Sequence, residues 1–478
     1  MPIVVNRPLE SRAVSDFLRS AAHRPSGLVI EGEPGIGKTT LWLSAIDEAR
    51  ASGQRVFSAR VGQAESVLAY AAVADLLREV DAALLADLPD VQRVAVDRVL
   101  LRASSEDHTT DQRVVAAAFA SVFERLVADS PVLIAIDDLQ WLDRSSQDVV
   151  AFAARRFKGR IGFLATERSG AAGGNAVTWL HLSRPDGIER VRVGQLSLGG
   201  LHVLISERLG RSLPRPTMVQ IAEISGGNPF FALELARAID AGSTNALSGL
   251  PESLSELMRL RIGLLDREAR NLLLAAASLA DATLDVLAAL TGGSVERTLE
   301  VLDDAEAKGI IVIDGELVRF AHPLLAQSVY ADASPAERRA MHRALAQQVA
   351  LPELRARHMA LAASRADPET LHALDTAAPV ARARGAPAAA AELLELAIGL
   401  GGDTPSRRIR AAAHHLQAGD ADRAYDAIVP AIDQLQSGVE RAVALNLLAA
   451  LRIQNDSFEG AAKLLSEALD DAGDHLEV

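Results

Sequence analysis

The chain has 478 residues, a formal net charge of −14 and no cysteine, with 49% hydrophobic and 23% charged residues, so we expect two to four globular domains. The missing cysteines exclude disulfides, thiolate metal sites and thiol nucleophiles, and the acidic balance argues against an extended nucleic-acid surface. No apolar run approaches the roughly 20 residues that cross a bilayer, and the first residues lack the pattern of a signal peptide, so we expect a cytoplasmic protein.

The first informative stretch is LVIEGEPGIGKTTLW, residues 28–42. Leu28 to Glu31 predicts a short buried strand, Gly32 to Gly37 a loop, and Lys38 the start of a helix. This order of strand, glycine-rich loop and helix lets backbone N–H groups and the helix N-terminus surround phosphate oxygens. A glycine-rich turn before an ordinary helix is the alternative interpretation.

Two side chains of this stretch carry the expected chemistry. Lys38 is expected to reach the β and γ phosphates of a nucleotide, and the Thr39 hydroxyl to bind Mg²⁺. The predicted nucleotide contacts are Gly32, Glu33, Pro34, Gly35, Ile36, Gly37, Lys38, Thr39 and Thr40. Only four lysines occur in the chain, so a chance match to this pattern is expected in roughly a few per thousand chains of this length.

The segment PVLIAIDDLQWLD occupies residues 131–143. Val132 to Ile136 is a continuous apolar run, which is typical of a parallel strand covered on both faces. The run ends in Asp137, which we expect to hold Mg²⁺, and Asp138, which would orient or deprotonate an attacking water. A helix cap or a solvated turn is the alternative for such a pair of aspartates.

A third predicted strand, Ile161 to Thr166, is followed by Arg168. Open α/β sheets bind ligands beyond the carboxyl ends of their strands, so Arg168 is placed to contact the γ phosphate and to sense its presence. An exposed arginine at the start of a loop is the alternative. A last strand is expected near Val191 to Val193.

The next part of the chain predicts helices and one hairpin. Residues 198 to about 241 predict a helical lid that contains SGGNPFF, and two helices follow. A further helix precedes two strands around Asp314 and Gly315, which are a strong hairpin signal. Helices followed by a hairpin are the pattern of a winged helix. Its last helix carries five acidic residues against Arg297 and Lys308, so we expect DNA to repel it and expect a role within the molecule.

From about residue 351 the chain is rich in alanine and predicts consecutive helices. Gly385, Gly419 and Asn455 stand at equivalent positions, at spacings of 34 and 36 residues. That period is typical of tetratricopeptide-like (TPR-like) helix pairs. The equivalent small residues, where helices approach closely, are Ala390, Ala424 and Gly460. We expect this array to continue beyond the last residue of the chain.

Five motifs, EGEPGIGKTTL, LIAIDDLQWLD, ATER, SGGNPFFALELA and RFAHPLLAQSVY, occur in this order within roughly residues 1–350. In them the chain resembles the ATPase region of the large LuxR-type transcriptional regulators, the MalT-like branch of the STAND class of signal-transduction ATPases. The resemblance implies an ATP/ADP-operated switch whose ADP-bound closed form opens on binding inducer and ATP. It also implies further repeats and a C-terminal helix-turn-helix DNA-binding domain beyond residue 478.

The resemblance implies functions for residues outside the phosphate loop as well. Pro229 in GGNP becomes an adenine-side contact, and His322 in FAHP becomes the winged-helix histidine that approaches the β phosphate and holds the closed state. Arg7 and Glu10 would lie near the base through a motif, usually valine-glycine-arginine-glutamate, that here is VNRPLE. Without the resemblance, GGNP predicts a turn before a helix and His322 a packed or capping side chain.

The sequence thus predicts an α/β P-loop NTPase with an AAA/STAND-like parallel sheet, then a helical lid, a winged-helix domain and TPR-like repeats. The expected bounds are 1–195, 196–248, 249–350 and 351–478. We expect any hydrolysis of ATP to ADP and phosphate to be slow and to serve regulation. The residues expected to carry it are Lys38, Asp137, Asp138 and Arg168, with Thr39 and Asp137 holding Mg²⁺.

Two alternatives to the switch stay open, an AAA-type ATPase that does mechanical work and a nucleotide-binding scaffold without turnover. Besides the nucleotide, the expected partners are an inducer or regulatory protein on the helical repeats and a second copy of the chain in the ATP state. We expect DNA contact only through a domain beyond residue 478, and no membrane contact.

Overall fold

The computed structural model describes residues 7–102, 110–169, 179–183, 187–240, 253–454 and 458–473. The chain divides into two compact units. The first comprises Met1–Ser66, Ala71–Val96 and Ala116–Ser334, and the second comprises Val67–Tyr70, Asp97–Val115 and Pro335–Val478. Across the described ranges, no helix has both the length and the apolar character needed to cross a membrane.

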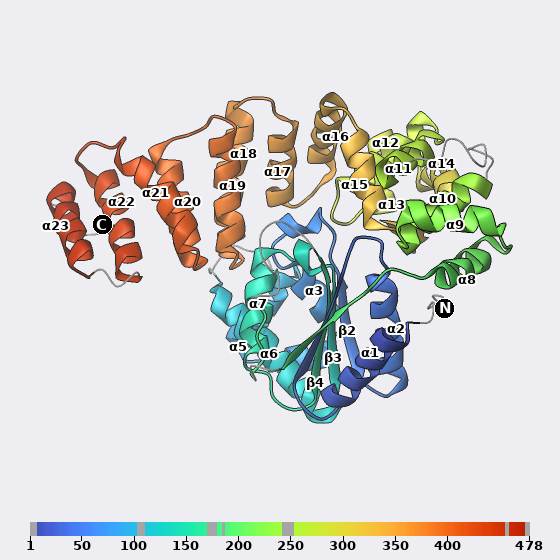
Figure 1. The fold of residues 1–478 in the computed structure, drawn as a ribbon. Helices are drawn as coiled ribbons and strands as arrows, with labels where there is room; N and C mark the ends of the chain where they lie inside the picture. Colours follow the sequence, from blue (N-terminus) through green and yellow to red (C-terminus); the bar gives the residue numbers. More distant parts are fainter. Residues whose placement is uncertain are drawn as a thin grey trace. The chain divides into compact units, whose positions relative to one another are not determined.

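A five-stranded parallel sheet is the centre of the first unit (Figure 1). Its strands are β1 (Ser26–Gly32), β2 (Arg55–Arg60), β3 (Val132–Asp137), β4 (Ile161–Arg168) and β5 (Ile188–Arg192). They lie in the order β2-β3-β4-β1-β5, and every neighbouring pair is parallel. Four of these strands confirm the prediction, and β2 is an addition to it. Because all five run in one direction, their carboxyl ends meet at one edge of the sheet.

Helices cover both faces of the sheet, as its apolar strands require (Figure 1). On the face of α1 and α2, Trp42 and Leu133 share one buried core. On the face of α6, the rings of Phe57 and Phe123 meet edge to face with centroids 5.2 Å apart. The helices around the sheet are α1 (Pro8–Ala21), α2 (Lys38–Ala51), α3 (Ala71–Arg78), α4 (Ala82–Ala86), α5 (Asp90–Val99), α6 (Gln112–Asp129) and α7 (Arg144–Ala154).

Three helices follow the sheet and pack on one another: α8 (Leu198–Leu209), α9 (Arg215–Ser225) and α10 (Pro229–Asp240). The elements after them are α11 (Leu254–Gly263), α12 (Arg267–Ala277), α13 (Leu284–Thr291), α14 (Val295–Ala307), β6 (Ile311–Asp314), β7 (Leu317–Phe320) and α15 (Pro323–Asp332). Strands β6 and β7 pair antiparallel, and Gly315, with a φ of 61°, makes the tight turn predicted there. An isolated bridge joins Thr283, just before α13, to Leu317.

The second unit contains an array of helices in which each packs against the next. They are α16 (Pro335–Gln348), α17 (Pro352–Ala362), α18 (Pro368–Ala383), α19 (Pro387–Gly399), α20 (Pro405–Gln417), α21 (Ala421–Ile432), α22 (Val439–Gln454) and α23 (Phe458–Ala472). The predicted repeat is visible in the backbone, since Gly385 and Gly419 follow α18 and α20 with φ of 86° and 77°. Ala390 and Ala424 are fully buried, and Asn455 lies outside the described residues.

Three buried histidines of this array predict sensitivity to mild acid. Burial, followed by nearby charged groups, lowers the pKa of His342, His358 and His414 to about 4 each. The unfolded chain therefore binds more protons than the folded chain, and stability is lost as pH falls from about 6.5 towards about 4. Because the Nδ1 atoms of His342 and His358 lie 3.0 Å apart in a shared hydrogen bond, these two rings titrate as a pair.

We expect the melting temperature to fall between about pH 7.5 and about pH 5, where most carboxylates stay ionised. A His414→Gln variant should show a smaller fall, because it has one titrating group fewer. An equal melting temperature at both pH values would contradict the assignment of neutral, buried histidines.

Candidate functional site

The carbonyl oxygens of residues 32–36 are all held by hydrogen-bond donors. The donors are Lys38 Nζ to Gly32 and Glu33 (3.0 Å each), the Asn228 side chain to Pro34 (2.9 Å), the Phe230 N–H to Gly35 (3.2 Å) and the Arg7 guanidinium to Ile36 (2.9 Å). In a trans peptide the following N–H points away from the carbonyl, so the N–H groups of Gly35 and Gly37 face the opposite side. Both glycines have left-handed φ, of 79° and 103°. N–H groups arranged in this way are suited to an anion.

Helix α2 begins at Lys38, as predicted, and adds its N-terminus to the loop. Lys38 is buried with only 6% of its surface exposed, and burial lowers its pKa, an effect that the carboxylates of Asp138 and Asp137 oppose. Thr39 and Thr40 follow in the first turn of α2 and stay partly exposed. The loop, the lysine and the two threonines thus place N–H, ammonium and hydroxyl donors together, which is the donor set that an anion requires.

Asp137 ends β3 beside this surface. The Thr39 hydroxyl donates to Asp137 Oδ1 at 3.4 Å, although 98 residues separate them. Burial, followed by the charge of Asp138, raises the pKa of Asp137. A buried carboxylate next to a hydroxyl is a donor set of hard oxygen atoms, and it fits Mg²⁺ held through water and phosphate oxygens.

Asp138 has a positive φ of 58° and lies beside Arg168, whose Nε is 4.0 Å from Asp138 Oδ1. Gln140 links the two, because its Nε2 donates to Asp138 at 2.7 Å and its Oε1 accepts from the Arg168 N–H at 3.3 Å. The Arg168 guanidinium also lies over the Trp141 ring, 5.4 Å from its centroid. The structure therefore brings together three of the predicted residues, Lys38, Asp137 and Asp138, with Arg168 beside them.

Two side chains at this sheet edge were missing from the sequence prediction. Arg60, at the end of β2, has its Nε 3.7 Å from Asp137 Oδ2. The hydroxyl of Thr166 donates to Asp137 Oδ1 at 2.6 Å and accepts from the Asp138 N–H at 2.7 Å. A polar residue inside the buried ATER strand was the available signal for Thr166. Arg60 gave none, because β2 itself was not recognised.

Replacing Thr166 by valine is expected to destabilise the protein by about 2 kcal/mol or more, because the Asp138 N–H and one oxygen of Asp137 each lose a buried partner. Urea unfolding measures this change. Thr166→Ser, which keeps the hydroxyl, is the matched control and should lose much less stability. A valine variant as stable as the wild-type protein would show that these two hydrogen bonds contribute nothing.

The GGNP segment contacts the loop through the residues on both sides of Pro229. Asn228 caps α10, since its Oδ1 accepts from the N–H groups of Phe230 and Phe231 at 3.1 and 3.2 Å. A Cβ placed on Gly35 would lie 2.9 Å from the Phe230 Cβ, so the loop and α10 pack without room for a side chain between them. Pro229 starts α10, and its contact with adenine stays a prediction.

His322 caps α15 and stacks on Phe230, with ring centroids 4.0 Å apart and an interplanar angle of 18°. Its Nδ1 accepts a backbone N–H at 3.2 Å and therefore carries no proton. Burial, followed by the charges of Arg168, Lys38 and Arg60, lowers the pKa of His322 to about 3. A neutral imidazole thus lies near Lys38 of the loop and near the arginines that end β2 and β4.

Arg7 ties the start of the chain to the loop. Its guanidinium donates to Ile36 O and, at 2.7 Å, to Gly194 O, while Glu10 Oε1 lies 3.4 Å away. These contacts hold the loop to the segment after β5. The proposed contact of Arg7 and Glu10 with the base stays a prediction.

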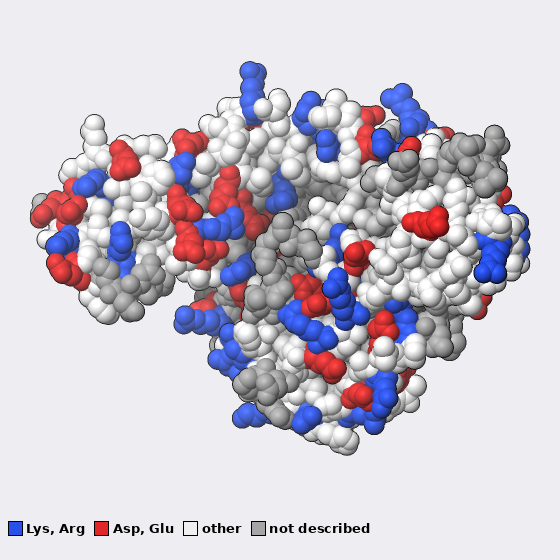
Figure 2. Space-filling model, in the orientation of Figure 1, with Lys and Arg blue, Asp and Glu red and all other residues white. Residues whose placement is uncertain are grey.

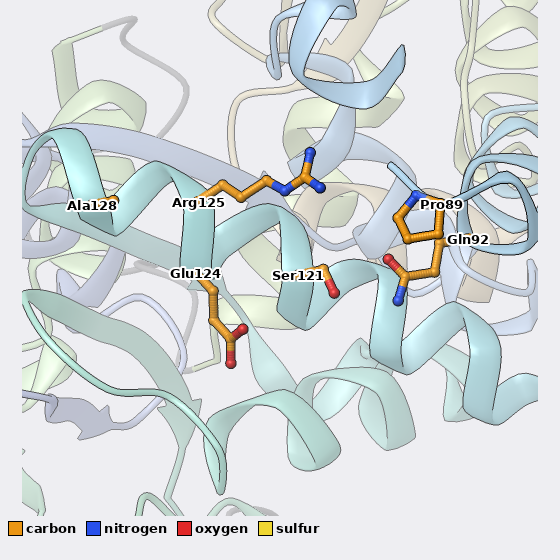
Figure 3. A pocket seen from close by; sticks show the side chains of 6 residues that line it. All are labelled: Pro89, Gln92, Ser121, Glu124, Arg125 and Ala128. Carbon is orange, nitrogen blue, oxygen red and sulfur yellow. The ribbon is translucent and has the colours of Figure 1, made fainter. Parts of the chain in front are cut away.

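A shallow hollow of about 370 Å³ lies elsewhere, at α6 and the start of α5 (Figure 3). Its lining residues are Pro89, Gln92, Ser121, Glu124, Arg125 and Ala128. None of them belongs to the loop or to a strand end, so this hollow takes no part in the candidate site.

The sheet order, the loop and the acidic end of β3 define the P-loop NTPase class of fold, followed by a helical region, and the predicted fold class is confirmed. The AAA ATPase domain family matches residues 4–163. No curated protein matches the chain.

Among solved structures, a STAND protein (Signal Transduction ATPase with Numerous Domains) with a tetratricopeptide repeat sensor from Pyrococcus horikoshii is similar in fold. Its TM-score is 0.51 at 14% identity, over 98% of this chain and 65% of that chain. A Walker-type ATPase of Pyrococcus abyssi aligns at a TM-score of 0.34 and 15% identity, over 68% of this chain and 96% of its own. The Orc1 protein of Aeropyrum pernix in complex with DNA aligns at a TM-score of 0.33 and 16% identity, over 70% of this chain and 94% of its own.

Proposed function

We propose that the chain is an ATP/ADP-operated switch. The observation that carries the proposal is the position of His322, whose ring stacks on Phe230 of α10. The backbone N–H of Phe230 in turn donates a hydrogen bond to the loop carbonyl of Gly35. Three parts of the chain that are far apart in sequence thus meet where phosphates would bind. A nucleotide there changes contacts to the loop, to α10 and to α15 together, which is what a switch requires.

The proposed site uses the residues already described. Lys38 and the loop N–H groups hold the phosphates, Thr39 and Asp137 hold Mg²⁺, and Asp138 orients an attacking water. When bound, Mg²⁺ would supply charge neutralisation between the phosphates. Arg168 then senses the γ phosphate, while Pro229, Arg7 and Glu10 remain the proposed adenine-side contacts.

We propose that residues 196–248 form the lid and 249–350 a winged helix, because α12, the bridge at Thr283, α13, α14 and the β6-β7 hairpin follow in that order. The last part of the second range is α16, which packs on α17 in the second unit. A role within the molecule is supported by the charges of α14. Arg297 pairs with Glu268 at 2.9 Å, and Lys308 pairs with Asp304 at 2.5 Å, so both cations already have carboxylate partners. On the face shown in Figure 2, basic and acidic side chains are interspersed, which does not favour DNA.

The finer proposal is that the switch belongs to a LuxR-type, MalT-like transcriptional regulator. An inducer or regulatory protein would then bind the helical repeats, and the ATP state would self-associate. DNA binding would need a helix-turn-helix domain beyond residue 478. These partners rest on the motif resemblance and remain to be tested.

Nucleotide released from the purified, denatured protein is the most direct test. We expect stoichiometric ADP on chromatography, because a resting switch retains the product. Moving such a switch from about 1:99 to 99:1 takes roughly 5.5 kcal/mol of differential binding, a scale that several charged contacts to one phosphate can supply. Sustained hydrolysis above about one per second would favour a work-performing ATPase instead, and no nucleotide binding at all would favour a scaffold.

A further inference from the structure

Two stretches that lie between elements of the nucleotide-binding part in sequence belong to the second unit: residues 67–70 and 97–115. The first follows β2, which ends at Arg60, by only a few residues. The second runs into α6, which leads to Val132 at the start of β3, the strand whose last residue is Asp137. Both stretches are therefore continuous with strands that end in the candidate site.

Within the second unit these stretches hold the turn between α18 and α19. The Tyr70 hydroxyl, on a fully buried side chain, donates to Gly385 O. The Thr110 N–H donates to Ala383 O at 3.0 Å. From the turn itself, Arg384 donates to Ala69 O at 3.3 Å.

Arg384 also forms an ion pair that holds its side chain in place. It is 8% exposed, and it pairs with Glu353 of α17 at 2.7 Å. On the other side, the Arg98 guanidinium donates to the Thr110 hydroxyl and is itself buried. A buried arginine with a fixed carboxylate partner is a rigid donor, so the turn and the two stretches form one packed cluster.

Among the described residues, none covers the equivalent turn of the next helix pair in this way. Gly385 and Gly419 occupy the same repeat position, with φ of 86° and 77°. A Cβ placed on Gly385 would lie 3.0 Å from Thr110 O and 3.3 Å from the Tyr70 hydroxyl, whereas a Cβ on Gly419 would meet no atom of the described residues within 4 Å. The array thus contains its own control for the contact at Gly385.

We propose that residues 67–70, 97–102 and 110–115 form a clasp on the Gly385 turn, through which the helical repeats control the Asp137 end of the nucleotide site. Whatever loosens the clasp frees the connections to β2 and β3, and so changes how Asp137 and Arg60 are held. This proposal rests on the proposed function, because it assigns a regulatory input to the same site.

The test compares Gly385→Ala with Gly419→Ala in the full chain. Both substitutions place alanine at a left-handed φ, so both carry the same kind of backbone strain, but only the first intrudes on the clasp. Hydrogen exchange without nucleotide should be about tenfold faster at residues 67–70 and 110–115 in Gly385→Ala alone, the size expected for losing one buried hydrogen bond. Tyr70→Phe, which removes the hydroxyl and adds no atom to the turn, should act in the same direction.

The second readout is the ratio of ADP affinities with and without Mg²⁺, which general destabilisation would leave unchanged. We expect this ratio to change by about three- to tenfold in Gly385→Ala and Tyr70→Phe, and to stay at the wild-type value in Gly419→Ala. Equal exchange in all three variants overturns the clasp. Faster hydrogen exchange with an unchanged ratio of ADP affinities overturns the control of the nucleotide site by the clasp. Absence of ADP binding to the wild-type protein overturns the proposed function itself, and the exchange comparison still decides the clasp.

Discussion

Replacing Lys38 by alanine is expected to abolish measurable nucleotide binding. The ammonium group is buried at the loop, where its charge would be largely unscreened and would face the phosphates. The substitution also removes the donor that holds the carbonyls of Gly32 and Glu33, so the loop loses part of its shape as well as its charge. A loss of about 3 kcal/mol or more, which is over a hundredfold in Kd, follows from removing one partner of a buried, charge-assisted contact.

Calorimetric titration with ADP and ATP measures this loss. Lys158→Ala is the matched control, because it removes the same charge from an exposed position outside the loop. Wild-type ATP affinity in Lys38→Ala would contradict the assignment of the loop as the phosphate site. A melting temperature close to that of the wild type would show that the loss does not come from unfolding.

Replacing His322 by alanine is expected to speed the release of ADP by about tenfold, which corresponds to about 1.4 kcal/mol. The imidazole lies on Phe230 among the charges of Lys38, Arg60 and Arg168. Because its Nδ1 accepts a backbone N–H, its Nε2 is the nitrogen left for a phosphate. Removing the ring takes away this contact and uncovers Phe230.

His322 also caps α15, so a second variant is needed to separate its two roles. Asparagine is as good an N-cap as any residue, but it cannot replace Nε2 or stack in the same way. We expect His322→Asn to release ADP as fast as His322→Ala, while only the alanine variant loses about 1 kcal/mol of stability. Stopped-flow release of a fluorescent ADP analogue measures the rates. A wild-type rate in both variants would show that His322 does not retain ADP.

Local patterns explain why the phosphate loop and the end of β3 were predictable. The glycines, Lys38 and Thr39 act through backbone geometry that a few consecutive residues determine, and the apolar run before Asp137 is continuous because β3 is buried on both sides. The hairpin at Gly315 was predictable for the same reason, since a positive φ there calls for glycine.

The rest depends on contacts between distant residues. Strand β2 carries arginine at both ends and a serine within, so its apolar pattern is weak even though Phe57 is fully packed against α6. Asn228 and Phe230 contact a loop about 194 residues earlier, and no spacing along the chain predicts such a long-range contact. Only the resemblance to known regulators pointed to this segment, and it pointed to Pro229 rather than to its neighbours.

The hydrogen bonds on the carbonyls of residues 32–36 limit how the protein can be shortened. A fragment that ends at residue 195 keeps every residue of the loop together with Asp137, yet it lacks Asn228 and Phe230, the donors to Pro34 O and Gly35 O. Those two peptide groups would then be free to rotate and to turn a carbonyl towards the anion. The smallest piece that preserves the loop must therefore extend through α10, to Asp240.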